Sequence, residues 1–342
     1  MKAMLINRIG PIERARPPLL PAIIPEPAPG EADLLIRVST CGVCHTEVDE
    51  IEGRTPPPDL PVVPGHQVVG RVEQYGSAVS GFRTGDRVGV AWIFSTCGRC
   101  YQCRSGNENL CYEFRATGRD VNGGYAEYIT VPAAFAVPIP EQFTDVEAAP
   151  HLCAGAIGHR SLKLTNLSNG MTLGLTGFGA SAHLVLKLVR HLYPGSKVYV
   201  FSRSEQERHF ALELGAAWAG DIGERSPVPL DRIIDTTPAW KPVVEALQDL
   251  VPGGRLVINA IRKENADRAT LLGLDYHRHL WMEKEIKSVA NVSRTDVREF
   301  LAIAARVPII PEIEEYSLEE ANQALFEMKE RKIRGAKVLR IG

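Results

Sequence analysis

Four cysteines in one short segment constrain this chain more than any other feature of its sequence. Cys97, Cys100, Cys103 and Cys111 follow the spacing C-x2-C-x2-C-x7-C. Four thiolates on so short a loop can occupy the corners of one tetrahedron, which is the geometry of a closed structural zinc site. The spacing therefore predicts that this loop folds around a zinc ion.

Two other uses of four cysteines agree less well with the sequence. Disulfides need an oxidising compartment, but the start MKAMLINRIG lacks the apolar core of a signal peptide, and no apolar run approaches a membrane span. We therefore expect a cytoplasmic protein with reduced thiols. An iron–sulfur cluster also takes four cysteines, but its usual spacing differs from this one.

Length and charge limit the classes of protein to which the chain can belong. Its 342 residues exceed what one compact core usually takes, so two domains are expected. The formal net charge is -2, with both signs mixed along the chain. Because phosphate binding needs a basic face, nucleic acid is not expected as a partner. A membrane is not expected either, because no apolar run is long enough to span one.

The pattern of strands and helices changes along the chain. Up to about residue 152, short strands alternate with turns rich in Gly and Pro. From residue 171, apolar strands (171–175, 197–201, 233–235, 256–259 and 286–289) alternate with amphipathic helices (180–191, 204–214 and 243–250). Ser204 and Glu207 form a possible capping box at the second of these helices. This alternation predicts a doubly wound parallel sheet. A helix over 318–332 and a strand over 337–341 are expected to follow.

A glycine-rich turn opens the second part of the chain. The strand at 171–175 leads through Gly174 into a turn with Gly177 and Gly179 before the next helix, and Thr176 replaces the middle glycine of the usual motif. Glycines at such a turn let backbone amides approach a pyrophosphate at a helix N-terminus. The strand, turn and helix together indicate a dinucleotide-binding site, with these four residues at the cofactor.

The end of the following strand bears on the choice of cofactor. Ser202 and Arg203 stand there, where NAD enzymes usually have an acidic residue. Arg203 could donate charge-assisted hydrogen bonds to a 2'-phosphate, which favours NADP(H). The alternatives are a solvated arginine, or one that lies over the adenine of NAD(H), and Glu205 could still reach a ribose hydroxyl.

Three further residues have the chemistry of a second metal site. Cys44, His66 and Cys153 could supply two thiolates and an imidazole, leaving one position open as in a catalytic zinc site. Taken singly, a buried cysteine is more often packing and a lone histidine is more often a hydrogen-bonded polar group. From the residues alone, both interpretations stay open.

These segments, in order along the chain, resemble the zinc-containing alcohol dehydrogenases of the medium-chain dehydrogenase/reductase superfamily. The resemblance rests on residues 41–47, 65–70, 97–111, 123–128 and 152–155. It implies an α/β protein: a GroES-like, β-rich catalytic domain (1–153 and 292–342) and a Rossmann domain with a doubly wound parallel sheet (154–291). It also implies zinc-dependent, reversible hydride transfer between a primary or secondary alcohol and NAD(P).

The resemblance assigns roles to individual residues. It implies that Cys44, His66 and Cys153 bind the catalytic zinc and that Cys41 is packing. Thr46 matches the hydroxyl that passes on the alcohol proton, and a hydroxyl suits this role because it donates and accepts at once. His45 matches a position that contacts the cofactor pyrophosphate. Trp92 matches a wall of the substrate pocket in some members, although core packing explains it equally well.

Three residues depart from the family pattern. Gln67 stands where a glutamate near the zinc is common, so we expect a more positive metal site. Asp49 stands where many members have the histidine that ends the proton relay, and either this carboxylate or water could take the proton. Glu47 replaces the usual aspartate and is one methylene longer.

Two other functions could use some of the same motifs. A polyol or other specialised hydroxy-substrate dehydrogenase would share the same motifs. A zinc-ribbon-like binding or regulatory protein would use only the four-cysteine loop, and the dinucleotide turn argues against it. The family associates as homodimers or homotetramers, often through the edges of the Rossmann sheets, so an oligomer is expected.

Overall fold

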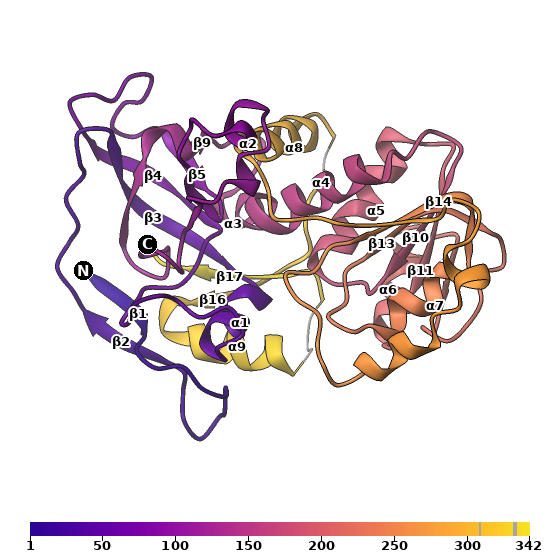
Figure 1. Cartoon of the computed structure of the whole chain (residues 1–342). Coiled ribbons are helices and arrows are strands. Elements are labelled where there is room, and N and C mark those ends of the chain that lie inside the picture. Colours follow the sequence, from indigo (N-terminus) through magenta and orange to yellow (C-terminus); the bar gives the residue numbers. More distant parts are fainter. Residues whose placement is uncertain (308, 331–333) are drawn as a thin grey trace. The chain divides into compact units, whose positions relative to one another are not determined.

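The computed structural model describes residues 1–307, 309–330 and 334–342, which form two compact units. Unit 1 consists of Met1–Ala156 and Val292–Gly342, and unit 2 of Ile157–Asn291. In Figure 1 the indigo start and the yellow end of the chain therefore belong to the same unit. The functional domain boundaries at residues 153 and 292 stay a prediction.

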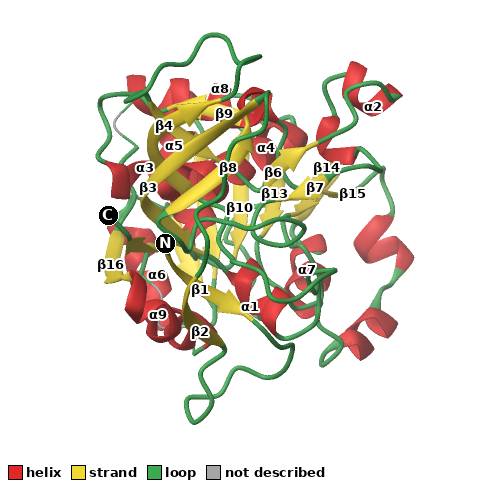
Figure 2. Cartoon of the chain, turned by 90° about the vertical axis from the view of Figure 1, so that its left-hand side faces the viewer, coloured by secondary structure: helices red, strands yellow, loops and turns green. Residues whose placement is uncertain are grey.

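Unit 1 is built on a mixed sheet of seven strands around β3 (Asp33–Val43). The apolar residues 34–36 of β3 are buried, and β4 and β8 pair with this strand antiparallel. Figure 2 shows the strands of this unit in yellow. The others in the sheet are β4 (Val68–Tyr75), β5 (Arg87–Val90), β8 (Tyr128–Pro132), β9 (Ala136–Pro138), β16 (Ile313–Ser317) and β17 (Ala336–Arg340).

Short elements of unit 1 lie between these strands. Two further strand pairs are β1 (Lys2–Ile6) with β2 (Leu19–Ile23) and β6 (Ile93–Ser95) with β7 (Arg115–Ala116). The α-helices are α1 (His45–Ile51), α2 (Tyr101–Arg104), α3 (Asp145–Pro150), α8 (Arg294–Arg306) and α9 (Ala321–Lys329). Tighter or wider turns form η1 (Glu108–Leu110), η2 (Ala133–Phe135), the π-helical η3 (His151–Gly155) and η6 (Leu318–Glu320).

Unit 2 has a six-stranded parallel sheet in the order β12-β11-β10-β13-β14-β15. Because the chain proceeds outward from β10 in both directions, right-handed crossovers place its helices on both faces. The strands are β10 (Thr172–Thr176), β11 (Lys197–Phe201), β12 (Trp218–Gly220), β13 (Leu230–Asp235), β14 (Leu250–Ile258) and β15 (Glu285–Ser288). The helices are α4 (Ala156–Thr165), α5 (Ala180–Leu192), α6 (Glu205–Glu213) and α7 (Lys241–Leu247), with turns η4 (Arg268–Gly273) and η5 (Tyr276–Leu280).

The α/β architecture with a β-rich domain and a doubly wound parallel sheet is confirmed, but several element boundaries are wrong. The expected helix 243–250 ends at Leu247, because Leu250 starts β14 and is buried in the same core. The expected helix 318–332 is a 3-10 turn followed by α9, and residues 331 and 332 lie outside the described residues. Helix α8, whose Ser293 and Asp296 form a capping box, was not predicted. None of the described helices is long and apolar enough to span a membrane.

Candidate functional site

The four-cysteine loop brings its sulfur atoms together as the spacing predicts. The Sγ atom of Cys97 lies 3.9 Å from that of Cys103 and 3.5 Å from that of Cys111, and the Sγ atoms of Cys100 and Cys103 are 3.5 Å apart. A zinc ion with four Zn–S bonds of about 2.3 Å holds its sulfurs about 3.8 Å apart. Backbone amides of Arg99 and Cys100 lower the pKa of Cys97 to about 6, which favours the thiolate. The donor set fits a structural zinc ion.

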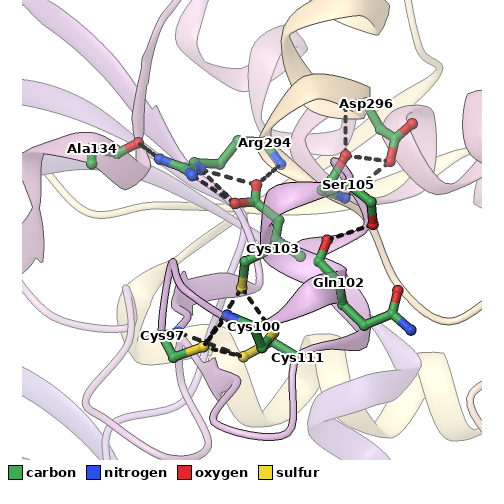
Figure 3. A network of polar contacts seen from close by, with 11 residues as sticks. Cys97, Cys100, Gln102, Cys103, Ser105, Cys111, Ala134, Arg294 and Asp296 are labelled. Carbon is green, nitrogen blue, oxygen red and sulfur yellow. Dashed lines mark hydrogen bonds and ion pairs between the residues drawn. The ribbon is translucent and has the colours of Figure 1, made fainter.

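A partly buried ion pair that the sequence analysis missed joins this loop to helix α8. Arg294 donates from Nη2 to Glu108 Oε2 at 2.6 Å, from Nε to Oε1 at 2.9 Å and from its backbone N–H at 2.9 Å. Figure 3 shows Arg294 between the cysteine cluster and Ala134, whose carbonyl accepts a further hydrogen bond. Burial raises the pKa of Glu108, but Arg294 lowers it more, so the pKa lies below its ordinary value. The pair ties the zinc loop to a segment 186 residues later in the chain.

Unit 1 also brings together the three scattered ligand candidates. Cys44 precedes α1, His66 precedes β4, and Cys153 lies in η3, yet their ligand atoms are all within 4.8 Å of one another. His66 Nε2 lies 3.3 Å from Cys153 Sγ. Two sulfurs and one imidazole nitrogen leave one position of a tetrahedron open, so this donor set fits a catalytic zinc ion.

Glu47 fixes the orientation of the ligand histidine. Its Oε1 lies 2.6 Å from His66 Nδ1, and its Oε2 accepts the Cys44 backbone N–H at 2.7 Å. Both side chains are fully buried. Burial raises the pKa of Glu47, and the neighbouring His66 lowers it. Because Nδ1 faces a carboxylate, Nε2 is directed toward the metal position. The extra methylene of Glu47 is therefore accommodated.

The other predicted residues near this site differ in their contacts and in their exposure to solvent. Thr46 Oγ1 lies 3.5 Å from Cys44 Sγ. Asp49 is buried, and its Oδ1 accepts from Arg54 Nε at 2.7 Å. Gln67 is buried, and its effect on the charge of the zinc site stays a prediction. Cys41 is fully buried, as expected for a packing residue. His45 is exposed at the start of α1.

Trp92 lies among side chains of unit 1. Its ring centroid is 5.2 Å from that of Phe114, and the Arg119 guanidinium lies 5.2 Å above the ring. These contacts agree with packing. The role of Trp92 in a substrate pocket stays a prediction.

In unit 2 the glycine-rich turn follows β10 as the sequence predicts. Gly177 has a φ of +78°, which favours glycine, and Gly179 caps α5. Gly174 lies within β10, close under Leu230 and Ile233. Thr176 turns its hydroxyl toward Asp235, donating to Oδ1 at 2.6 Å. The threonine at the motif's middle position is thus used to bind the neighbouring strand β13.

The carboxylate of Glu207, expected only as part of a capping box, lies beside the residues that follow β11. Ser202 Oγ donates to Glu207 Oε2, which also accepts the Phe178 backbone N–H at 3.3 Å. The predicted capping box is therefore only half formed: Ser204 accepts from the Glu207 N–H, but the Glu207 side chain bonds elsewhere. Arg203 is exposed, and its guanidinium has no partner within the described part of the chain.

Comparison with known proteins places the chain in a family. The model of the alcohol dehydrogenase GroES-like domain matches residues 30–141. A probable alcohol dehydrogenase AdhA from Mycobacterium tuberculosis (strain CDC 1551 / Oshkosh) is 44% identical over 100% of this chain and 97% of its own length. An alcohol dehydrogenase from Geobacillus stearothermophilus is 33% identical over 91% of this chain and 92% of its own.

A solved structure with the same fold adds to these sequence relatives. A cinnamyl alcohol dehydrogenase from Sorghum bicolor superposes with a TM-score of 0.88 at 27% identity, over 99% of this chain and 97% of its own. The two metal sites and the dinucleotide turn fit the same class. The chain thus belongs to the zinc-type medium-chain alcohol dehydrogenases, the NAD(P)-dependent oxidoreductases that act on CH–OH groups.

Proposed function

We propose that the enzyme interconverts a primary or secondary alcohol with its aldehyde or ketone, with NADP(H) preferred over NAD(H). The convergence of Cys44, His66 and Cys153 around one open position carries this proposal. When bound there, zinc supplies Lewis-acid polarisation of the substrate oxygen, and the nicotinamide exchanges the hydride. A polyol is the alternative substrate class, because the same residues would serve it.

Proton movement is assigned to this chain's own hydroxyl and carboxylate. Thr46 Oγ1, 3.5 Å from a ligand sulfur, accepts the substrate proton and donates its own. Asp49 is the proposed acceptor at the end of this path. Its ion pair with Arg54 holds the carboxylate in one orientation. Thr46→Val should lose most of kcat, whereas Thr46→Ser, which keeps the hydroxyl, should retain most of it.

The preference for NADP(H) is supported by Arg203. It follows β11 directly, is exposed, and can form charge-assisted hydrogen bonds with a 2'-phosphate. Glu207 acts in the opposite direction, since its carboxylate is held beside Ser202 and would repel that phosphate. The balance between these two side chains sets the preference.

Titration of the protein with NADPH and NADH, followed by fluorescence, tests the preference. The wild type should bind NADPH more tightly. Arg203→Gln should weaken NADPH by about tenfold and leave NADH unchanged, and Glu207→Gln should strengthen NADPH. Tighter binding of NADH by the wild type would refute the NADP(H) preference. A panel of alcohols and polyols, each assayed with both cofactors, then identifies the substrate class.

We also propose a homo-oligomer joined at the edge strand β15. This strand ends the sheet order of unit 2, and all four of its residues are exposed. Large apolar side chains are exposed on and near it: Leu272, Tyr276, Trp281 and Ile286. A free edge with apolar neighbours is a surface that pairs with another strand. Light scattering should show a dimer or tetramer, and Ile286→Lys should yield smaller species; a monomeric wild type would contradict the proposal.

A further inference from the structure

Helix α1 holds two fully buried carboxylates one turn apart. Glu47 is 0% exposed and Glu50 is 1% exposed. Glu47 has partners on both oxygens, His66 Nδ1 and the Cys44 amide. Neither oxygen of Glu50 has a hydrogen-bond partner in the described part of the chain. A buried carboxylate without a partner is costly, so its surroundings must compensate for the charge.

Glu50 is placed near the catalytic metal site by helix α1: it follows Glu47 by three residues, on the same side of the helix, and Cys44 is the N-cap of that helix. Burial and the charge of Glu47 raise the pKa of Glu50 well above its ordinary value, His66 and Arg119 lower it, and Cys44 raises it. Two of these four residues, Cys44 and His66, are proposed zinc ligands, and Glu47 binds one of them. Glu50 therefore lies within electrostatic reach of the metal position.

Other buried polar groups of unit 1 interact with Glu50 or with Arg119, whose charge acts on Glu50. The Tyr125 hydroxyl and the Trp92 indole N–H are buried, and neither has a hydrogen-bond partner in the described part of the chain. Burial raises the pKa of Tyr125, and Glu47, Cys41, Cys44 and Glu50 raise it further. Arg119, stacked over Trp92 and paired with Asp120, is a cation whose charge acts on Glu50.

Gln67, directly after the ligand histidine, is an amide and adds no negative charge to the metal site. Its side chain packs against Gly42, so closely that a Cβ at position 42 would lie 2.7 Å from the amide carbon. The amide is neutral and fixed there. Negative charge beside the ligands therefore has to come from α1.

We propose that Glu50 is a positioning residue of the catalytic zinc site, and that its carboxylate is the second buried negative charge beside the metal when zinc is bound. The proposal rests on the assignment of Cys44, His66 and Cys153 as zinc ligands and is independent of the cofactor preference. A dication at that site supplies the partner charge that Glu50 lacks among the described residues in contact with it, and Glu50 in turn makes release of that dication less favourable.

Zinc release into an excess of a chromogenic chelator measures this role without using turnover. The holoenzyme should release its two zinc ions in separate phases. Glu50→Gln, which keeps the size of the side chain, should release the catalytic zinc at least about tenfold faster and leave the structural zinc unchanged. Glu52→Gln is the matched control, because Glu52 lies just after α1 but pairs with Arg54 and Lys329.

A second variant tests charge rather than packing. Gln67→Glu introduced into Glu50→Gln should restore slow release, and the visible spectrum of the cobalt-substituted protein should shift in the single variant and return in the double. Glu50→Asp keeps the charge and should release zinc slowly. If Glu50→Gln does not fold, the release rate of Glu50→Asp is the measurement that tests the proposal. Wild-type release rates and spectra in Glu50→Gln would overturn the proposal. A wild type with one zinc ion per chain would instead refute the ligand assignment itself.

Discussion

Replacing Arg294 by alanine should strongly destabilise the packing of the four-cysteine loop (residues 97–111) against helix α8. The variant removes the guanidinium that pairs with Glu108, whose side chain is 8% exposed, and leaves that carboxylate without its ion-pair partner. Breaking a buried pair costs about 3–5 kcal/mol. Because the Arg294 side chain itself is 30% exposed, we expect the low end of that range, about 3 kcal/mol. Such a loss makes local opening roughly a hundredfold more frequent.

Amide hydrogen exchange of the zinc-loaded protein measures this opening directly. Peptides covering residues 97–111 and 294–306 should exchange roughly a hundredfold faster in Arg294→Ala, while peptides from unit 2 keep the wild-type rate. Arg99→Ala is the matched control in the same loop, because its pair with Glu113 is exposed and should contribute nothing measurable. If these peptides exchanged at the same rate in Arg294→Ala as in Arg99→Ala, the ion pair would not hold the four-cysteine loop to α8.

Three further predictions concern other parts of the chain. Cys100→Ser should lose the structural zinc and lower the melting temperature, since such a site contributes directly to folding, and an unchanged melting curve would exclude the site. Gly177→Ala forces a side chain into a φ of +78°, with its Cβ 2.8 Å from Thr236 Oγ1, so cofactor titration should show at least about fivefold weaker binding, whereas Gly223→Ala, in open space, should bind normally. Lys337 and Tyr316 hold the pKa of Glu327 down to about 2, below its ordinary 4.5. Its contribution to stability is thus present above pH 4.5 and lost as the pH falls toward 2, so the melting difference between wild type and Glu327→Gln should shrink over that interval; a constant difference would contradict the assignment.

The sequence predicts those parts of the molecule that depend on short spacings. The four-cysteine loop closes within fifteen residues, so the spacing alone predicts its geometry. The turn at Gly177 lies between adjacent elements and is equally local. Cys44, His66 and Cys153 come from distant segments, and only the resemblance to a family indicated that they meet.

The environments of three acidic residues could not be predicted from the sequence. Glu50 and Glu108 are buried and Glu207 is partly buried, although glutamate is usually exposed. Their roles depend on partners that lie beside them only in the fold: Arg294 for Glu108, and Ser202 with Phe178 for Glu207. The predicted end of helix α7 is wrong for a similar reason. Leu250 belongs to β14 and packs in the core of unit 2, and this tertiary contact cannot be read from the local sequence.

The most direct test of the catalytic zinc site is an assay of alcohol-dependent reduction of the nicotinamide cofactor. It compares wild type with Cys44→Ser, each at known zinc content. Cys44→Ser removes one ligand of the open site and leaves the four-cysteine loop intact. The wild type should hold about two zinc ions per chain and reduce the cofactor, whereas the variant should fold, keep about one and show no turnover. A wild type with a single zinc ion and no turnover, or a Cys44→Ser variant as active as the wild type, would contradict the assignment of a zinc-dependent alcohol dehydrogenase site to Cys44, His66 and Cys153.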